Sequence, residues 1–322
     1  MVRPGRLLLL AGLVLMFGSA GLFMAWRAPG PARNPVTITV AQGATLTSTA
    51  RELERAGAIR SATLFSRLGR LVGGGRPIQA GAYEIAAQAS PAAILAQLQD
   101  GRTVQHLLTI PEGMPSILVH ERLMAQPLLT GTIPVPEEGS VLPDSYAFEA
   151  GETRAAVLGR MQKAMTETLD AAWARRAPTT VVHSKAEALV LASIVEKETA
   201  LSSERRTVAA VYSNRIRVGM RLQADPTIIY PITKGKPLGR RIRKSELRAR
   251  NGYNTYAMAG LPRGPIANPS REAIRAVLDP APSDALYFVA DGKGGHIFAR
   301  TLDAHQANVS RYYAIRRARG EM

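Results

Sequence analysis

The longest apolar stretch of the chain lies close to its N-terminus. Residues 7–26 carry no charge and are largely apolar, and they match the ~20 residues that a membrane-spanning helix needs. Arg3 and Arg6 precede this stretch, which favours a cytoplasmic location for residues 1–6 and an exported body. A cleaved signal peptide is the alternative, with residues 18–20 (Gly-Ser-Ala) as the cleavage site. Because apolar residues continue beyond that site, we favour a retained, single-pass anchor.

A small folded unit is predicted after a Pro-rich linker at residues 27–35. The alternation of apolar residues, the helix caps and the glycines predict its elements in order: a strand at 36–40, helices at 45–56 and 61–71, a strand at 81–85 and a helix at 91–100. The turn Gln42-Gly43 ends the first strand. The unit spans residues 36–103 and resembles a LysM module, a common peptidoglycan binder. A plain scaffold can have the same topology, so this alternative stays open.

The rest of the chain, residues 104–322, has the pattern of a larger mixed domain. We expect a strand at 104–110, a long helix at 153–176, and a hairpin around the glycine-rich turn at 291–295, followed by a C-terminal helix. The predicted fold class is therefore α+β: an N-terminal transmembrane helix, a small LysM-like unit and a mixed α+β domain.

The formal charge of +16 limits the partners that the chain can have. Basic residues are densest at residues 234–250, where Glu246 is the only acidic residue. This segment is either a solvated loop or a surface that attracts an anionic polymer or anionic lipid headgroups. We exclude nucleic acid as a partner, because neither a recognised nucleic-acid module nor interleaved aromatic residues accompany the charge.

The sequence lacks the residues that several kinds of catalytic and metal sites require. The chain has no cysteine, which excludes thiolate metal sites and a cysteine nucleophile. Its five histidines are dispersed and form no pair at metal-ligand spacing, so we predict no metal site. A serine-hydrolase elbow of the form G-x-S-x-G is also missing.

One glutamate follows an unusually apolar helix. Ser184 and Glu187 have the spacing of a capping box, and the helix that they start is apolar on every face up to residue 195 except for Ser193. Glu196 comes directly at its end. A carboxyl in apolar surroundings, at the negative end of a helix, should have a raised pKa. A carboxylic acid of this kind can protonate a leaving glycosidic oxygen, so we predict a general acid at Glu196.

Two other interpretations of Glu196 remain open from spacing alone. It can be a structural carboxylate paired with Lys197 or Arg205, or Glu198 can be the reactive member. Glu198 lies about 200° around a regular helix from Glu196, so only one of them is expected to face a site.

Clusters of amide and hydroxyl side chains beside aromatic rings occur in the second half of the chain. Such groups suit sugars, because they offer hydrogen bonds to hydroxyls and flat faces to C–H surfaces. Ordinary turn chemistry is the alternative interpretation. The residues concerned are Asn214, Gln223, Asp225, Tyr253, Asn254, Thr255 and Tyr256.

These strings together resemble a known family. They are LASIVEKETA (191–200), SER (203–205), NRIRVGMRLQADPTIIY (214–230), YNTY (253–256), GLPRGPIANP (260–269) and YFVADGKGGHIF (287–298). In order and spacing they closely resemble the bacterial endolytic murein transglycosylases, and the upstream string PDSY (143–146) fits with Ser145 where many members carry Thr. The segment 234–250 matches the family poorly.

The resemblance implies an inner-membrane enzyme with its catalytic domain in the periplasm. Such an enzyme cuts nascent glycan strands between N-acetylmuramic acid and N-acetylglucosamine and leaves 1,6-anhydro ends, which terminates strand elongation. It needs no cofactor, and its expected partners are glycan strands, the membrane and cell-wall synthases. Glu196 falls on the family's catalytic glutamate, and we expect substrate contacts at Gln223, Asp225, Asn254 and Thr255, with Asn214, Tyr253 and Tyr256 as further candidates.

Two competing functions are kept. A hydrolytic muramidase would use Asp225 as a second carboxylate to activate water. A non-catalytic cell-wall scaffold would bind peptidoglycan without cutting it.

Overall fold

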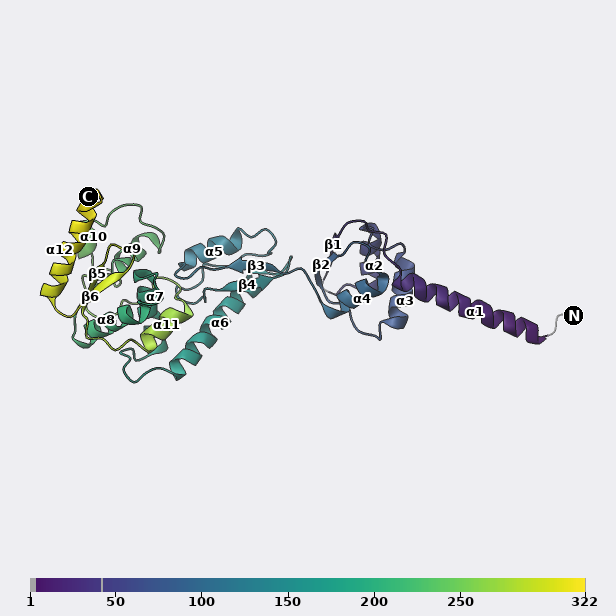
Figure 1. Ribbon diagram of the computed structural model, residues 1–322, viewed down its shortest axis with the longest axis horizontal. Coiled ribbons are helices and arrows are strands. Elements are labelled where there is room, and N and C mark those ends of the chain that lie inside the picture. The colour runs from purple at the N-terminus through teal and green to yellow at the C-terminus, as the bar shows by residue number, and fades with distance from the viewer. Residues whose placement is uncertain (1–3, 42, 322) are drawn as a thin grey trace. The chain divides into compact units, whose positions relative to one another are not determined.

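The computed structural model describes residues 4–41 and 43–321, the side chains of residues 4–15 excepted (Figure 1). The chain divides into two compact units. Unit 1 holds Met1–His106 and Ala147–Gly151, and unit 2 holds Leu107–Tyr146 and Glu152–Met322. The described elements are helices and three separate two-stranded sheets, which makes the fold α+β as predicted.

Unit 1 contains a long helix and a small α/β core. Its elements are α1 (Pro4–Arg27), β1 (Val36–Val40), α2 (Leu46–Arg55), α3 (Ala62–Val72), β2 (Gly81–Ile85) and α4 (Pro91–Asp100). Strands β1 and β2 pair antiparallel, with Val36 opposite Ile85. The expected order of elements is therefore confirmed. Helix caps predicted from sequence form as expected, since the Ser61 and Ser90 side chains accept hydrogen bonds from backbone N–H groups of α3 and α4.

The core of unit 1 lies between the small sheet and helices α2, α3 and α4. Ile38, Leu53, Tyr83 and Leu98 are fully or almost fully buried there. Trp26 at the end of α1 belongs to the same cluster, with its ring 5.5 Å from that of Phe65. The apolar face of each short element thus packs against its neighbours in one core.

Helix α1 covers the predicted anchor, residues 7–26. In the part of the chain that the structure describes, no helix has the combined length and apolarity that crossing a bilayer requires. Arg3 and Gln42, which entered the sequence predictions, lie outside the described residues, as do the side chains of residues 4–15.

Unit 2 is built mainly from helices around α7. In chain order its elements are β3 (His106–Thr109), α5 (Ser116–Met124), β4 (Ser145–Phe148), α6 (Arg154–Ala174), α7 (Lys185–Glu198), α8 (Arg205–Arg217), α9 (Pro226–Thr233), α10 (Lys244–Arg248), α11 (Arg271–Leu278), β5 (Tyr287–Ala290), β6 (His296–Ala299) and α12 (Leu302–Ala318). Strands β3 and β4 pair, and their ends at His106 and Ala147–Phe148 belong to unit 1. Strands β5 and β6 form the predicted hairpin. Helix α7 packs against α6, α8 and α11.

Helix α7 is buried as its sequence predicts. Residues 190–195 are all buried, and Leu191, Ala192 and Val195 are fully inaccessible. Ser184 caps the helix through the backbone N–H of Glu187, at 3.1 Å. The Glu187 carboxylate accepts from the N–H of His183, at 2.7 Å, rather than from that of Ser184, so the reciprocal half of the expected capping box is displaced by one residue. Packing on every side leaves the end of α7 in a fixed position.

Candidate active site

Glu196 lies in the last turn of α7 with its side chain only 4% exposed. Its Oε2 accepts hydrogen bonds from the backbone N–H of Ser270, at 2.8 Å, and from the Ser270 hydroxyl, at 2.5 Å. The same hydroxyl oxygen caps α11 by accepting from the N–H of Ala273, at 3.2 Å. The carboxyl group is therefore held at the N-terminal end of α11, where the helix dipole and free N–H groups favour negative charge.

An arginine lies on the other side of the carboxyl group. Nη2 of Arg205, whose side chain is 7% exposed, lies 3.4 Å from Oε1 of Glu196 and 3.1 Å from Oε2 of Glu112. The pairing of Glu196 with Arg205 that the sequence left open is present. Lys197, the other suggested partner, is exposed and directs its Nζ at the carbonyl of Gly113, at 3.5 Å.

The surroundings of Glu196 thus differ from the expected apolar pocket. The expectation of burial holds, but the expectation of purely apolar neighbours is wrong, because Ser270 and Arg205 present hydrogen-bond donors to both carboxylate oxygens. The Glu196 carboxyl therefore accepts three hydrogen bonds, one from Arg205 and two from Ser270. The donors come from segments that no local pattern links to α7.

A glycine loop covers the Glu196 side chain. Gly113 has φ +67°, and a Cβ added there would lie 3.2 Å from Cγ of Glu196. The loop is held by the segment that carries Ser270: the N–H of Gly113 donates to the carbonyl of Asn268, at 3.0 Å, and the Asn268 amide donates to the carbonyl of Met114, at 2.9 Å. Only glycine fits this close approach without strain.

Glu198 occupies a different environment, as the helical spacing predicts. Burial raises the pKa of its carboxyl to about 7, and the nearby Asp225 carboxylate adds to the rise, while Tyr212 and Arg215 oppose it. Its Oε1 is buried without a hydrogen-bond partner among the described residues. The two glutamates of α7 therefore belong to separate clusters, one with Arg205 and Ser270, the other with Tyr212 and Arg215.

Two of the expected sugar-binding residues are accessible. Asp225 is exposed, and its Oδ1 accepts from the hydroxyl of Tyr256, at 2.7 Å. Gln223 is also exposed and has φ +54°, a left-handed conformation that is uncommon for a residue other than glycine. Such strained positions are concentrated at functional sites. Tyr253 is half-buried, with its ring 4.9 Å from that of Tyr230.

Three other expected residues use their polar groups inside the protein. The Asn254 amide donates to backbone carbonyls of residues 246, 247 and 249. The Thr255 hydroxyl accepts from the N–H of Ala224, at 3.0 Å, and is 2.9 Å from the hydroxyl of Thr227. Asn214 donates to the carbonyls of residues 283 and 285. These contacts favour the structural alternative for Asn254, Thr255 and Asn214.

Several residues around Glu196 were not foreseen from the sequence. Ser270, Asn268 and Glu112 each contribute to the arrangement described above. Glu138 lies next to it and accepts from the backbone N–H of Ser116, at 2.9 Å, and burial raises the pKa of its carboxyl. Two features of the sequence could have indicated these residues. Ser270 precedes a helical pattern of apolar residues at 271–278, as a helix cap does, and Pro-Glu-Gly at 111–113 is typical of a turn.

The basic segment 234–250 is largely exposed. Lys236 pairs with Glu121, at 2.6 Å, and Arg240 pairs with Glu246, at 2.5 Å.

No group of three or more histidines, aspartates or glutamates within the described ranges could hold a metal ion.

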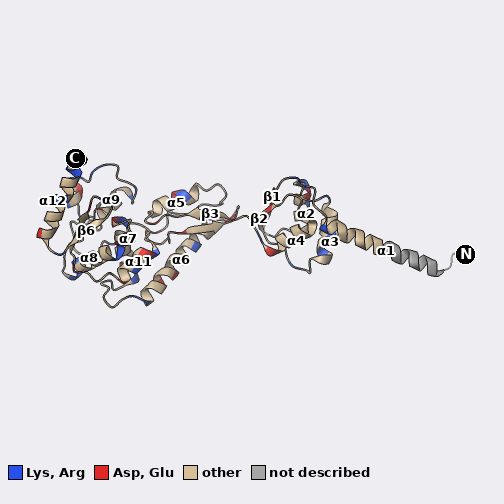
Figure 2. Ribbon diagram, in the orientation of Figure 1, with Lys and Arg blue, Asp and Glu red and all other residues tan. Residues whose placement is uncertain are grey.

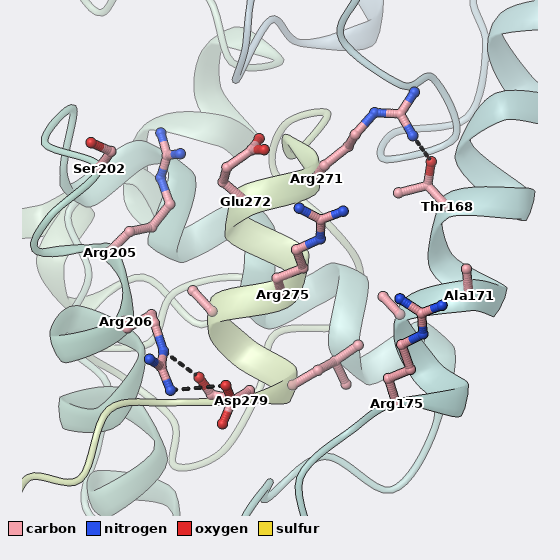
Figure 3. Close-up of a pocket in the computed structure, with 13 residues that line it drawn as sticks. Thr168, Ala171, Arg175, Ser202, Arg205, Arg206, Arg271, Glu272, Arg275 and Asp279 are labelled. Atoms are coloured by element: carbon pink, nitrogen blue, oxygen red, sulfur yellow. Dashed lines mark hydrogen bonds and ion pairs between the residues drawn. The ribbon is translucent and has the colours of Figure 1, made fainter.

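A cavity of about 530 Å³ in unit 2 is lined in part by Arg205 (Figure 3). Glu196 does not line this cavity, but Nη2 of Arg205 lies 3.4 Å from its carboxyl group. In Figure 2, basic and acidic residues lie on α6 and near α11, two of the helices that line the cavity. Unit 2 therefore brings together a buried carboxyl group and a basic cavity.

Comparison with known proteins places these features in a family. Among similar proteins are the endolytic murein transglycosylases of two strains of Streptococcus pneumoniae, each 28% identical over 326 residues, which cover 86% of this chain and 58% of the relative. The enzyme of the same description from Bacillus subtilis is 32% identical over 177 residues, 55% of this chain and 48% of the relative. The chain thus spans about half the length of these relatives.

A solved structure has a similar fold. The crystal structure of a YceG-like protein from Listeria monocytogenes matches with a TM-score of 0.54 and 26% identity, covering 86% of this chain and 99% of that one. The sequence model of the YceG-like family matches residues 38–311. Since this match covers most of the chain and includes both units, the chain belongs to the YceG-like family.

Proposed function

We propose that this chain is a lytic transglycosylase of peptidoglycan. It cuts the β-1,4 bond between N-acetylmuramic acid and N-acetylglucosamine inside nascent glycan strands and leaves 1,6-anhydro ends. The names of the relatives from Streptococcus pneumoniae and Bacillus subtilis support this activity. The observation that carries the proposal is Glu196, a 4% exposed carboxyl fixed by Ser270 and Arg205 at the end of a buried helix.

The reaction needs one carboxyl group that is used twice. Glu196 first donates its proton to the glycosidic oxygen as the bond to muramyl C1 breaks. The resulting carboxylate then takes the proton from the muramyl C6 hydroxyl, whose oxygen attacks C1 of the same ring. No water is consumed, and Glu196 ends protonated as it began. A hydroxyl of the same sugar replaces the water that a second carboxylate would have to position.

Ser270 and Arg205 act as positioning residues in this scheme. Between the two proton transfers Glu196 is a carboxylate, and the three donors of Ser270 and Arg205 stabilise its negative charge. Their donors hold the two oxygens in one orientation, so that the oxygen that gave the proton can receive the next. A buried carboxylate without such partners would be costly.

Exposed polar residues near the end of α8 are the proposed sugar contacts. Gln223 and Asp225 are accessible, and the ring of Tyr256 is held through its hydroxyl by Asp225. Tyr253 adds a half-buried aromatic face. Amide, carboxylate and aromatic groups together can hold a sugar through its hydroxyls and its C–H surface.

The hydrolytic alternative receives little support from this geometry. A muramidase would need Asp225 to act together with Glu196. Asp225 instead bonds to Tyr256 and contributes to the environment of Glu198. Mass analysis of products decides between the two reactions, because hydrolysis adds one water to the products and transglycosylation adds none. The proposal predicts anhydro-muramic ends, and products with only reducing muramic ends would overturn it.

The location and the partners are also proposals. We propose that residues 7–26 anchor the chain once in the inner membrane, with the following residues in the periplasm, and that residues 36–103 bind glycan as a LysM-like unit. The uncharged apolar run and the strand–helix–helix–strand order support these assignments. Cell-wall synthases, which produce nascent strands, are the proposed protein partners. Protease added to spheroplasts should digest the body of the chain, and its protection would contradict the orientation.

A further inference from the structure

Five arginines line the cavity that contains Arg205, the residue that contacts Glu196 (Figure 3). The cavity holds about 530 Å³, within the range of small-ligand sites. Its walls come from α6, α11 and the start of α8, and Figure 3 shows Arg275 projecting from the middle of α11. Glu272 and Asp279 are the acidic residues of its lining, and the arginines are Arg175, Arg205, Arg206, Arg271 and Arg275. Positive charge is therefore in excess.

Not all of this charge is compensated by the protein. The side chains of three arginines are bonded: Arg205 to Glu112 and Glu196, Arg206 to Asp279, and Arg271 to Thr168 and Asp144. Among the described residues, no hydrogen bond or ion pair holds the other two, Arg175 and Arg275, and both are exposed. Because the three bonded arginines are each paired with a carboxylate, the two unpaired guanidinium groups are the ones that can bind an anion entering the cavity.

The position of the cavity restricts which anion that is. Arg205 lines the cavity and also lies 3.4 Å from Glu196. Arg271 directly follows Ser270, the residue that donates to Glu196. A glycan strand that places its glycosidic bond at Glu196 therefore brings the substituents of the neighbouring muramic acid to the arginines.

We propose that this cavity binds the carboxylates of the peptides that muramic acid carries. This inference rests on the function proposed above. Peptide chain ends and acidic side chains are ionised carboxylates at neutral pH, and the planar guanidinium matches a carboxylate with two parallel hydrogen bonds. A phosphate group has similar chemistry, but only the peptide travels with the sugar at the cut. The cavity thus makes the enzyme prefer strands that still carry peptides.

The test compares two substrates and two double variants of the full chain in detergent. The substrates are uncrosslinked glycan strands with their peptides and the same strands after an amidase has removed them. The test variant is Arg175→Ala with Arg275→Ala. The control is Arg311→Ala with Arg317→Ala, two exposed arginines of α12 without side-chain partners within the described ranges. Both variants lose the same charge from helical or helix-end positions, where alanine is well tolerated.

The readout is the ratio of kcat/KM on peptide-bearing strands to that on peptide-free strands. We expect this ratio to fall about tenfold in the test variant, the size of one charged hydrogen bond, and to stay at the wild-type value in the control. An unchanged ratio in the test variant, an equal fall in the control, or no preference in the wild type would each overturn the inference. So would a loss of binding to anionic phospholipid vesicles with the ratio unchanged, because it would assign the arginines to lipid.

Failure of the proposed function can be told apart from failure of the inference. Binding of both fluorescently labelled strands is measured by anisotropy in the same proteins. If the wild type cuts neither strand, the proposed function is wrong. The inference is then decided by binding alone: tighter binding of peptide-bearing strands that the test variant loses supports it, and equal binding of both strands refutes it.

Discussion

The buried Glu198 makes a measurable prediction about stability. Burial raises the pKa of its carboxyl from 4.5 to about 7 in the folded protein. Below pH 4.5 the Glu198 carboxyl is protonated in both the folded and the unfolded chain. The free energy of unfolding is then not reduced by the titration of this group. Between pH 4.5 and 7 the folded protein keeps a proton that the unfolded chain releases. Stability is therefore lost as the pH rises through this window.

The size of this loss follows from the shift. One bound proton gives a slope of about 1.4 kcal/mol per pH unit, so the window from 4.5 to about 7 corresponds to roughly 3 kcal/mol. Replacing Glu198 with Gln removes the titration. We expect the free energy of unfolding of the variant to fall by about 3 kcal/mol less than that of the wild type between pH 4.5 and 8.

Urea unfolding followed by tryptophan emission isolates unit 2. The chain has two tryptophans, Trp26 in unit 1 and Trp173 in unit 2, so Trp26→Phe leaves one probe in the unit that contains Glu198. Free energies of unfolding are then measured at half-unit steps of pH. Glu167→Gln is the matched control, because this carboxyl is 66% exposed on α6.

The result that would refute this reasoning is simple to state. If Glu198→Gln and Glu167→Gln show the same pH dependence as the parent protein, Glu198 titrates alike in the folded and unfolded chain. Its burial would then not govern its charge. If Glu198→Gln alone reduces the pH dependence of the free energy of unfolding, the folded protein holds the Glu198 carboxyl in its neutral form.

Three further substitutions test the contacts around the site. Gly113→Ala adds a Cβ that would lie 3.2 Å from Glu196 Cγ at φ +67°, so we expect a loss of about 1 kcal/mol in urea unfolding and a lower kcat. Ser270→Ala removes a donor to Glu196 and the cap of α11, and should cost about 1 kcal/mol in the same assay and reduce kcat. Asn254→Ala leaves backbone carbonyls without their donor and should cost about 2 kcal/mol in unfolding, whereas wild-type stability with a raised KM would restore its proposed role in substrate binding.

The elements that the sequence predicted are those with a strong local signal. The all-apolar run of α7 predicted a buried helix, and serine caps predicted the starts of α3 and α4. Helices α9 and α11 were not predicted, because each has eight residues. Isolated helices of that length are marginal, so packing rather than local sequence stabilises them.

In the candidate site, too, residues with a local sequence signal were predicted and residues that depend on tertiary contacts were not. Glu196 was a candidate from its position after an apolar helix, and the family resemblance favoured it over the structural alternative. Its separation from Glu198 followed from helical geometry. Its partner Ser270 is 74 residues away in the sequence, and Gly113 is bonded to Asn268, far downstream. Contacts between such distant segments depend on the tertiary fold and leave no periodic signal. Asn254 differs in that its amide bonds to carbonyls only five to eight residues upstream, and this local contact was missed.

Strand cleavage by Glu196→Gln tests the central claim most directly. Glutamine keeps the shape of the side chain and removes its ability to give and take a proton. Glu198→Gln, two residues on in the same helix, is the matched control. With purified glycan strands, the account predicts that Glu196→Gln loses at least a ~100-fold factor in kcat while Glu198→Gln cuts close to the wild-type rate at neutral pH. Undiminished release of anhydro-muramic fragments by Glu196→Gln would contradict it.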